Sequence, residues 1–450
     1  MNRDGELPAG AADEHGSLLV LAILSLLVGV SVGLVGSAFR LCLERGDRLR
    51  DAVIEWAHGE RLAGLLLVVA ACGTATAAAA WLVRRFAPPA SGSGIPHVEA
   101  VLNGELPPAP FRLIPVKFSG GVLAIGSGLA LGREGPSVQM GASLAHLLGV
   151  VSRRTWADCR VLLAAGAGAG LATAFNAPTA GAVFVLEELL RCFDTRVAIA
   201  TFGTSGAALA VSRVLLGEAP DFAVAPLPYP GLGTVPVYLA LGVVAGLLGI
   251  AYNRTLLATL AAGDRLRRWP MELRAAVVGA AVGLLAWFAP GLVGGGDALT
   301  QRALVGTEAL GVLALVFLLR FGLGAVSYAA GTPGGLFAPM LVLGAQSGLL
   351  LGTVCGHWLP EVVPNPTAVA VVGMAAFFTA VVRAPVTGIV LVTEMTGSFT
   401  LLLPMLGACF AAMLVPTMLN DPPVYDSLRE ITLRAGGSEK QGAAATRPTS

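Results

Sequence analysis

Long runs of apolar residues recur along this 450-residue chain and restrict what it can fold into. The first two runs, 18–39 and 62–83, are each long enough to cross a bilayer, since roughly 20 apolar helical residues span its hydrocarbon core. Only 13% of the residues are charged, against about 25% in a soluble domain. Backbone polar groups in hydrocarbon must be satisfied within the segment, which favours helices. The sequence therefore predicts an all-α protein that crosses the membrane many times.

Later apolar segments are shorter, and glycine or proline interrupts several of them. Segments too short to span a bilayer indicate half-helices and re-entrant elements, which are typical of transporters. We expect a polar leader at 1–16 without regular structure, one transmembrane domain at 17–433, and a disordered tail at 434–450. Within the domain, a first half covers about 17–216, a second half about 236–419, and a final helix about 421–433. The later segments lie at about 112–131, 138–151, 161–175, 179–190, 198–216, 236–262, 275–290, 303–319, 321–330, 336–358, 367–382, 386–397 and 399–419.

Composition excludes several classes of function. The net charge of +1 gives no electrostatic case for binding nucleic acid. The six cysteines include no CxxC pair, and the five histidines lack a metal-ligand spacing, so we expect neither a disulfide framework nor a metal or other cofactor. No cleavable signal peptide is evident, because the leader before the first apolar run is acidic.

The stretch Gly132-Arg-Glu-Gly-Pro136 places two ionisable side chains inside an apolar region. An ionisable residue at membrane depth costs at least about 2.5–3.5 kcal/mol, so Glu134 is expected to be functional. Arg133 either extends to the surface or pairs with a carboxylate. Glycine permits close backbone approach and proline suits a helix's first turn, so we expect a helix to begin here with free N–H groups that attract anions.

Two further stretches also begin with glycine and end with proline. They are Gly92-Ser-Gly-Ile-Pro96 and Gly334-Gly-Leu-Phe-Ala-Pro339. Each helix N-terminus presents unsatisfied N–H donors and about half a positive charge. Converging N-termini could bind an anion without a full cation, so that the ion can still leave.

An internal repeat relates the two halves of the chain. The run Ala177-Pro-Thr-Ala-Gly-Ala-Val-Phe-Val-Leu-Glu187 aligns with Ala384-Pro-Val-Thr-Gly-Ile-Val-Leu-Val-Thr-Glu394 at an offset of 207 residues. The stretch ending at Pro136 aligns with the one ending at Pro339 at an offset of 203. Repeats with interrupted helices in matching positions predict a transport site where the two halves meet.

These motifs, with Phe175-Asn-Ala-Pro178, Glu187-Glu188 and the isolated Tyr425, resemble those of the CLC family of chloride channels and proton-coupled chloride transporters. The resemblance implies a fold of about eighteen tilted and re-entrant helices in two inverted-topology repeats. It also implies a homodimer with one pore per subunit and both termini in the cytoplasm. The charge count alone favours an outside N-terminus, since five arginines follow the first apolar run and one precedes it.

The resemblance also implies the ligands of the anion. The hydroxyls of Ser93 and Tyr425 would coordinate it from the inner side, and the backbone N–H groups of Leu336 and Phe337 would contribute from the second half. Considered alone, Ser93 could be an ordinary helix N-cap and Tyr425 an aromatic residue at the membrane interface.

The resemblance implies that Glu134 is the gating glutamate, which occupies the outer anion site when ionised, and that Glu188 relays protons on the inner side. Spacing alone does not decide between Glu187 and Glu188, which point in different directions on one helix. Glu394 could be a structural partner within the repeat. Lys117 either forms an ion pair, for example with Glu99, or changes the electrostatic potential at the anion.

The resulting interpretation is a chloride/proton antiporter in the plasma (inner) membrane that takes chloride and protons and binds no nucleotide. The alternative is an uncoupled voltage- or pH-gated chloride channel, in which the inner glutamate is usually replaced. An intramembrane serine hydrolase is excluded, because Ser91 stands where a G-x-S-G motif around Ser93 needs glycine.

Overall fold

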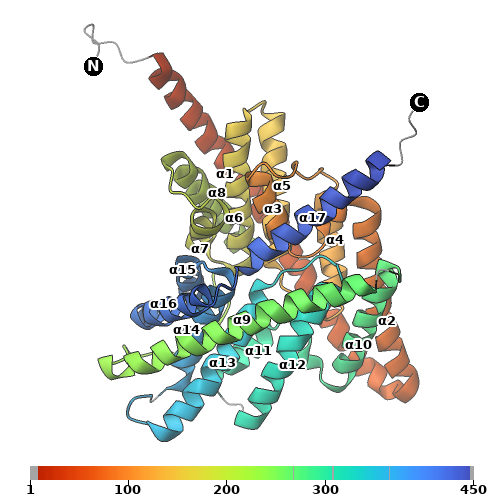
Figure 1. The fold of residues 1–450 in the computed structure, drawn as a ribbon, viewed down its shortest axis with the longest axis vertical. Coiled ribbons are helices and arrows are strands. Elements are labelled where there is room, and N and C mark those ends of the chain that lie inside the picture. The colour runs from red at the N-terminus through yellow and green to blue at the C-terminus, as the bar shows by residue number, and fades with distance from the viewer. Residues whose placement is uncertain (1–8, 267, 307–308, 364, 446–450) are drawn as a thin grey trace.

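The chain is described by a computed structural model that covers the backbone of residues 9–266, 268–306, 309–363 and 365–445, with side chains from residue 18 to residue 434. These residues form seventeen α-helices, with short 3₁₀ turns and one π-helical turn between them, as Figure 1 shows. Apart from the helices, two isolated β-bridges pair Gly92 with Pro333 and Gly132 with Gly335.

The α-helices are α1 Ala9–Ala57, α2 Arg61–Phe86, α3 Ile95–Leu102, α4 Leu113–Gly126, α5 Glu134–Val151, α6 Trp156–Phe175, α7 Pro178–Phe184, α8 Thr195–Leu216, α9 Val235–Arg265, α10 Met271–Phe288, α11 Asp297–Val305, α12 Leu310–Ala329, α13 Phe337–Trp358, α14 Pro366–Val382, α15 Pro385–Thr396, α16 Leu402–Met418 and α17 Val424–Ala445. The 3₁₀ turns are η1 His58–Glu60, η2 Pro88–Ala90, η4 Leu232–Thr234, η5 Pro290–Leu292 and η6 Phe399–Leu401, and the π-helical turn η3 covers Val185–Leu189.

Eight helical segments of the described chain are long and apolar enough to cross a membrane. The prediction of an all-α membrane protein is therefore confirmed. Helices α3, α7 and α11 have only 8, 7 and 9 residues, too few for a span, as the interrupted apolar segments indicated. Helix α3 begins and α7 ends among buried residues, where each can present a terminus to a site.

The two halves of the chain use the same packing pairs. Helix α1 packs on α8 as α9 packs on α16, and α5 packs on α6 as α13 packs on α14. Small residues allow close contact: a Cβ at Gly344 of α13 would lie 2.5 Å from the carbonyl oxygen of Gly373 in α14. In Figure 1 helices α5, α6 and α8 lie in the upper part of the view, above α9, α13, α14 and α16. Helix α2 packs on α10 and links the halves at one side.

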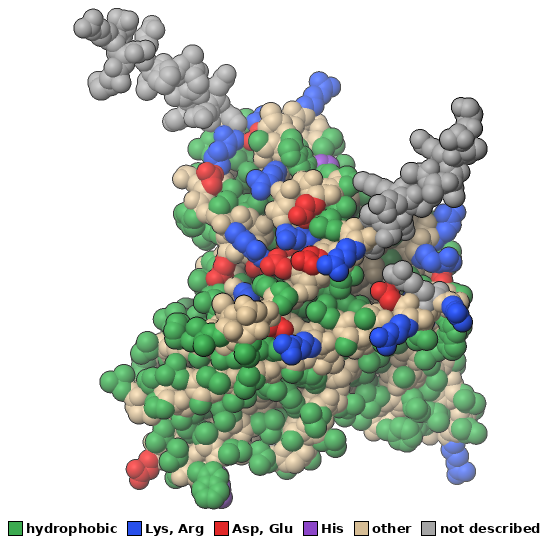
Figure 2. Space-filling model, viewed as in Figure 1, with side chains coloured by type: hydrophobic (Ala, Val, Ile, Leu, Met, Phe, Trp, Pro, Cys, Tyr) green, Lys and Arg blue, Asp and Glu red, His purple; other side chains and the backbone are tan. Residues whose placement is uncertain are grey.

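Charged side chains gather on the face seen in Figure 2, over α3, α7 and α17, whereas the surface over α9, α12 and α13 is mainly apolar. The apolar part includes exposed leucines and valines such as Leu247, Leu315 and Leu318. An apolar belt beside a charged end is the surface that a helical protein presents to lipid and to the aqueous boundary.

The predicted break between segments 303–319 and 321–330 was wrong. Helix α12 runs unbroken through Arg320, whose side chain is buried. Its guanidinium donates to the backbone carbonyls of Leu292, Gly294 and Gly295 at 2.9–3.2 Å. These bonds satisfy the guanidinium, so the charge does not require the helix to end.

Both terminal helices extend further than the sequence suggested. Helix α1 begins at Ala9, inside the expected leader, and α17 continues to Ala445, inside the expected tail. Alanines at 9, 11, 12 and 443–445 are strong helix formers. The rest of the expected leader, residues 1–8, and the end of the expected tail, residues 446–450, lie outside the described residues. Helix α1 continues through the charged residues that follow the first apolar run and ends at Ala57.

Candidate anion and proton site

The three glycine- and proline-rich stretches meet in the middle of the protein. Gly132 and Gly335 exchange backbone hydrogen bonds of 2.9 and 2.7 Å, and Gly334 donates to the carbonyl of Gly92 at 3.1 Å. Helices α3, α5 and α13 begin within a few residues of these contacts. Three helix N-termini therefore converge, each with N–H donors that no turn of its own helix satisfies.

Glu134, the first residue of α5, is completely buried between these termini. Its Oε1 accepts a 2.7 Å hydrogen bond from the backbone N–H of Phe337, the first residue of α13. Its Oε2 has no hydrogen-bond partner among the described residues. A Cβ at Gly132 or Gly335 would collide with the Glu134 carboxylate, so glycine at both positions makes room for it.

Ser93 and Tyr425 bring two hydroxyls to the same region. Both side chains are fully buried, and within the described part of the chain neither hydroxyl has a hydrogen-bond partner. The Ser93 hydroxyl would lie 2.6 Å from a Cβ at Gly135, so it faces the first turn of α5. The Tyr425 ring stacks on Phe337, with centroids 6.0 Å apart. Buried polar groups are nearly always hydrogen-bonded, so two such hydroxyls beside helix N-termini suit an acceptor such as an anion.

The backbone ligands expected from α13 lie where the carboxylate of Glu134 can reach them. Leu336 and Phe337 are fully buried at the start of α13. The Phe337 ring is packed against Phe175, Phe184 and Phe378, with centroids 4.6–6.1 Å apart. Because these rings hold Phe337, its N–H is a fixed donor, and a carboxylate or an anion can use it, though not both at once.

Arg133 does not extend to the surface, because it is held by other residues. Its Nε donates to the carbonyl of Ala174 at 2.7 Å, and its two terminal nitrogens reach Asp297 at 3.0 Å and Asp221 at 3.1 Å. Pairing was one of the two roles considered for it. Asp221 and Asp297 were missed, since nothing in the sequence links them to a residue 88 or 164 positions away.

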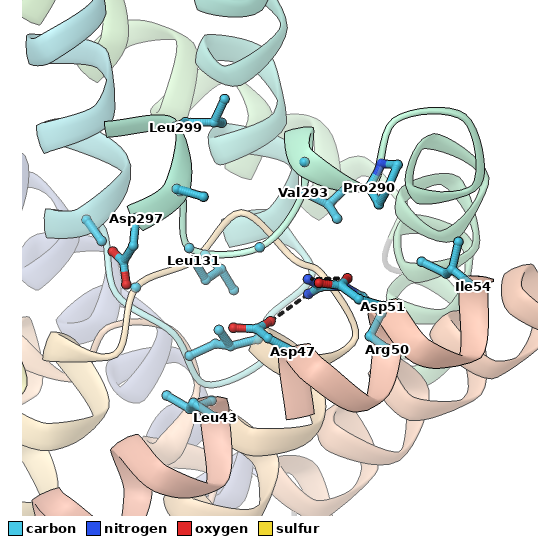
Figure 3. Close-up of a pocket in the computed structure, with 18 of the residues that line it drawn as sticks. Leu43, Asp47, Arg50, Asp51, Ile54, Leu131, Pro290, Val293, Asp297 and Leu299 are labelled. Atoms are coloured by element: carbon cyan, nitrogen blue, oxygen red, sulfur yellow. Dashed lines mark hydrogen bonds and ion pairs between the residues drawn. The ribbon is translucent and has the colours of Figure 1, made fainter. Parts of the chain in front are cut away.

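A cavity of about 660 Å³ reaches the start of α5 from one side of the protein. Its lining includes Gly132, Arg133 and Ala338, which adjoin Glu134 and Phe337. Figure 3 shows Asp47, Arg50 and Asp51 of α1 on one wall and Asp297 and Leu299 of α11 on another. The cavity therefore opens toward the start of α5, where Glu134 lies.

Glu188 lies apart from the converging helix termini, in the π-helical turn η3. Its side chain is only 4% exposed, and its Oε1 is 3.9 Å from Nη2 of Arg191. Arg191 also pairs with Asp426 at 3.1 Å. These residues line a second cavity of about 620 Å³. Glu188 is thus a buried carboxylate beside a cavity, an arrangement that suits a proton relay.

Glu187 has a different role from its neighbour. Its carboxylate accepts from the backbone N–H groups of Val386 and Thr387 and from the Thr387 hydroxyl, at 2.7–3.0 Å. It therefore caps the start of α15. Glu394, at the end of α15, accepts in turn from the N–H groups of Thr179 and Ala180 at the start of α7, at 3.1 and 2.9 Å. The two aligned glutamates cap each other's helices across the two halves.

Lys117 is fully buried and donates to the carbonyls of Ala90 and Gly92, at 3.0 and 2.7 Å. No ion pair joins it to Glu99 among the described residues, so the suggested pairing was wrong. The two carbonyls, in the turn before Ser93, accept hydrogen bonds from the ammonium in place of a carboxylate. A further contact that the sequence did not reveal is the 3.3 Å hydrogen bond from the Ser93 N–H to the hydroxyl of Tyr328.

Comparisons with known proteins identify the family and the fold of this chain. The family model described as voltage gated chloride channel matches residues 75–417. The H(+)/Cl(-) exchange transporter ClcA of Vibrio cholerae serotype O1 (strain M66-2) is 38% identical over 439 residues, which cover 95% of this chain and 92% of the relative. ClcA of Cronobacter sakazakii is 36% identical, covering 96% of this chain and 94% of the relative. The crystal structure of a slow cyanobacterial Cl-/H+ antiporter superposes with a TM-score of 0.89 at 32% identity, covering 92% of this chain and 98% of that one. This chain is a member of the voltage gated chloride channel family, the CLC family, and has its fold.

Proposed function

We propose that this protein exchanges chloride for protons across a membrane and catalyses no covalent reaction. Relatives that align with nearly its whole length carry the name H(+)/Cl(-) exchange transporter. The observation that carries the proposal is the Glu134 carboxylate on the Phe337 N–H, beside the unpartnered hydroxyls of Ser93 and Tyr425. One donor set thus serves either a carboxylate or an anion.

In the proposed cycle, Glu134 exchanges between two states. Ionised, its carboxylate holds the Phe337 N–H and blocks the outer anion site. Protonated, it no longer competes as an anion, so it leaves and chloride takes the N–H groups of Leu336 and Phe337. Ser93 and Tyr425 donate their hydroxyls to chloride from the inner side. Each proton that Glu134 takes up is thereby linked to movement of the anion.

Glu188 supplies the inner end of the proton route. Its carboxylate is buried, while Glu187 beside it is occupied as a helix cap. Protons from the second cavity would reach Glu188 and then Glu134, along a path separate from the chloride ligands Ser93 and Tyr425. A buried carboxylate here favours the antiporter over the uncoupled channel, which has no need of an inner acceptor.

The test is reconstitution of the purified protein in liposomes under an outward chloride gradient, with external pH recorded. We expect protons to be driven uphill in the direction opposite to chloride. Chloride flux with no proton movement at any gradient would support the channel instead.

We further propose that the protein is a homodimer in the plasma membrane, with a pore in each subunit and two inverted repeats per pore. The shared packing pairs of the two halves and the reciprocal caps of Glu187 and Glu394 support the repeats. Cross-linking in native membranes and photobleaching of labelled subunits would count the chains. A single bleaching step in most particles would exclude the dimer.

A further inference from the structure

Asp221 lies in the segment 217–231, which joins α8 of the first half to η4 and α9 of the second. Its carboxylate is only 3% exposed and bridges two guanidinium groups. Its Oδ1 is 2.9 Å from Nη2 of Arg40 in α1, and its Oδ2 is 3.1 Å from Nη2 of Arg133. One buried carboxylate thus serves two cations, one of which precedes the gating residue Glu134.

Contacts to several helices fix this segment in place. The N–H of Phe222 donates to the carbonyl of Met395 in α15 at 3.0 Å. Ala223 exchanges two hydrogen bonds, of 2.9 and 2.8 Å, with the side-chain amide of Gln301 in α11. On the other side, the side chain of Asn176 at the end of α6 donates to the carbonyl of Ala219 at 2.9 Å. Both halves therefore fix the position of Asp221, whose partners Arg40 and Arg133 belong to the first.

The other carboxylates near these cations are better hydrated. Asp297, which pairs with Arg133, is 54% exposed, and Glu44, which pairs with Arg40 at 3.2 Å, is 42% exposed. Water and salt screen such charges, whereas a buried charge is screened much less. Asp221 is therefore the buried carboxylate that pairs with both arginines.

Arg133 and Asp297 also line the 660 Å³ cavity that leads to Glu134. The balance between the two arginines and Asp221 therefore contributes to the potential along the approach of an anion, together with the charged residues of α1 that line the same cavity. Without Asp221 the buried charge of this cluster becomes more positive, and without Arg40 it becomes more negative.

We propose that Asp221 determines chloride affinity, by neutralising Arg40 and Arg133 beside the gate. This inference rests on the proposed function, since it assumes that chloride binds next to Glu134. Asp221 acts here through the field and through Arg133, without touching the anion.

The experiment measures chloride binding to the detergent-solubilised protein by isothermal titration calorimetry. We expect Asp221→Asn to lower the chloride Kd and Arg40→Met to raise it, each by about threefold, the size of effect that one partly screened charge produces. The double variant should return to within about twofold of the wild-type Kd, because its buried charge is restored. Asp221→Glu should keep the wild-type Kd.

A merely structural role gives a different pattern. Both single variants would then weaken binding, and the double variant would be no better than the weaker one; that result would overturn the proposal. If Asp221→Asn fails to fold, Arg40→Met and Arg40→Lys still decide, since Met should raise the Kd and Lys should not. An unchanged Kd in Arg40→Met would also overturn it.

The control variant is Glu272→Gln, which removes a carboxylate from an exposed ion pair with Arg84. Glu272 lies at the start of α10 and Arg84 near the end of α2. The 660 Å³ cavity lies beyond the opposite ends of these two helices, where Pro290 follows α10 and His58 precedes α2. The Kd of this variant should match wild type. Failure of the wild-type protein to bind chloride would count against the proposed function itself, and not against Asp221 in particular.

Discussion

Glu187 and Glu188 are adjacent carboxylates with opposite structural circumstances, so the same substitution should affect them in opposite ways. Glu187 accepts three hydrogen bonds from the start of α15. Glu188 is buried, and its Oε1 has no hydrogen bond among the described residues. We predict that Glu187→Gln lowers stability with a small effect on coupling. Glu188→Gln should abolish proton movement while chloride flux persists.

The magnitudes follow from the bonds lost. Glutamine at 187 keeps one acceptor oxygen for the three donors of Val386 and Thr387, and it loses the charge that favours a helix N-terminus. A hydrogen bond to a charged group contributes about 1.5–3 kcal/mol, and the site is partly hydrated, so the loss should be about 1–3 kcal/mol. Glutamine at 188 removes a buried charge whose ion pair with Arg191 is long, at 3.9 Å, so the stability should change by less than about 1 kcal/mol.

Two measurements test the pair. Thermal unfolding in detergent reports stability, and paired chloride and proton fluxes from the same liposomes report coupling. The control is Glu394→Gln, which removes the matching cap on α7 and should be destabilising to a similar degree as Glu187→Gln. Intact coupling in Glu188→Gln together with lost coupling in Glu187→Gln would refute the assignment of the relay. Intact coupling in both would place the proton path elsewhere.

Three other substitutions give distinct outcomes. Glu134→Gln mimics the protonated gate, so chloride flux should continue without proton pumping and without its pH dependence; uphill proton transport by this variant in the liposome assay would refute the gate. Ser93→Pro removes a hydroxyl donor, and the resemblance to the CLC family implies that proline at this position favours nitrate, so flux should shift from chloride toward nitrate; wild-type flux of fluoride well above chloride would contradict this selectivity. Lys117→Met leaves the carbonyl of Ala90 without the ammonium donor and takes one of two donors from the carbonyl of Gly92, so it should lower stability by about 2 kcal/mol, measured by thermal unfolding, with Lys440→Met in α17 as the control.

Much of the site could be predicted from local composition. A glycine and a proline a few residues apart specify a helix start with room for close approach, and α3, α5 and α13 begin at such stretches. The alignment of Glu187 with Glu394 likewise corresponds to a matched pair of helix caps. Such features depend on a few neighbouring residues, so the sequence contains them directly.

Ion pairs between distant segments could not be predicted in this way. Asp221 sits in a segment with no apolar periodicity, and its partners lie 181 and 88 residues before it. A charge inside an apolar run predicts that the helix ends there, yet α12 continues through Arg320. The structure buries this arginine by supplying three carbonyls from the turn after η5, a solution that depends on the tertiary fold.

The way each buried cation is satisfied bears on how the protein handles an anion. Lys117 and Arg320 direct their hydrogen bonds to backbone carbonyls, which carry partial charges, whereas Arg133 is held by the carboxylates of Asp221 and Asp297. Carbonyl oxygens satisfy the donors without cancelling the full charge, so positive potential remains in the interior. Beside the gate, however, a full positive charge would hold chloride too tightly and would oppose protonation of Glu134. A carboxylate placed on Arg133 weakens that field while the helix N-termini still attract the anion, so that chloride can bind and also leave.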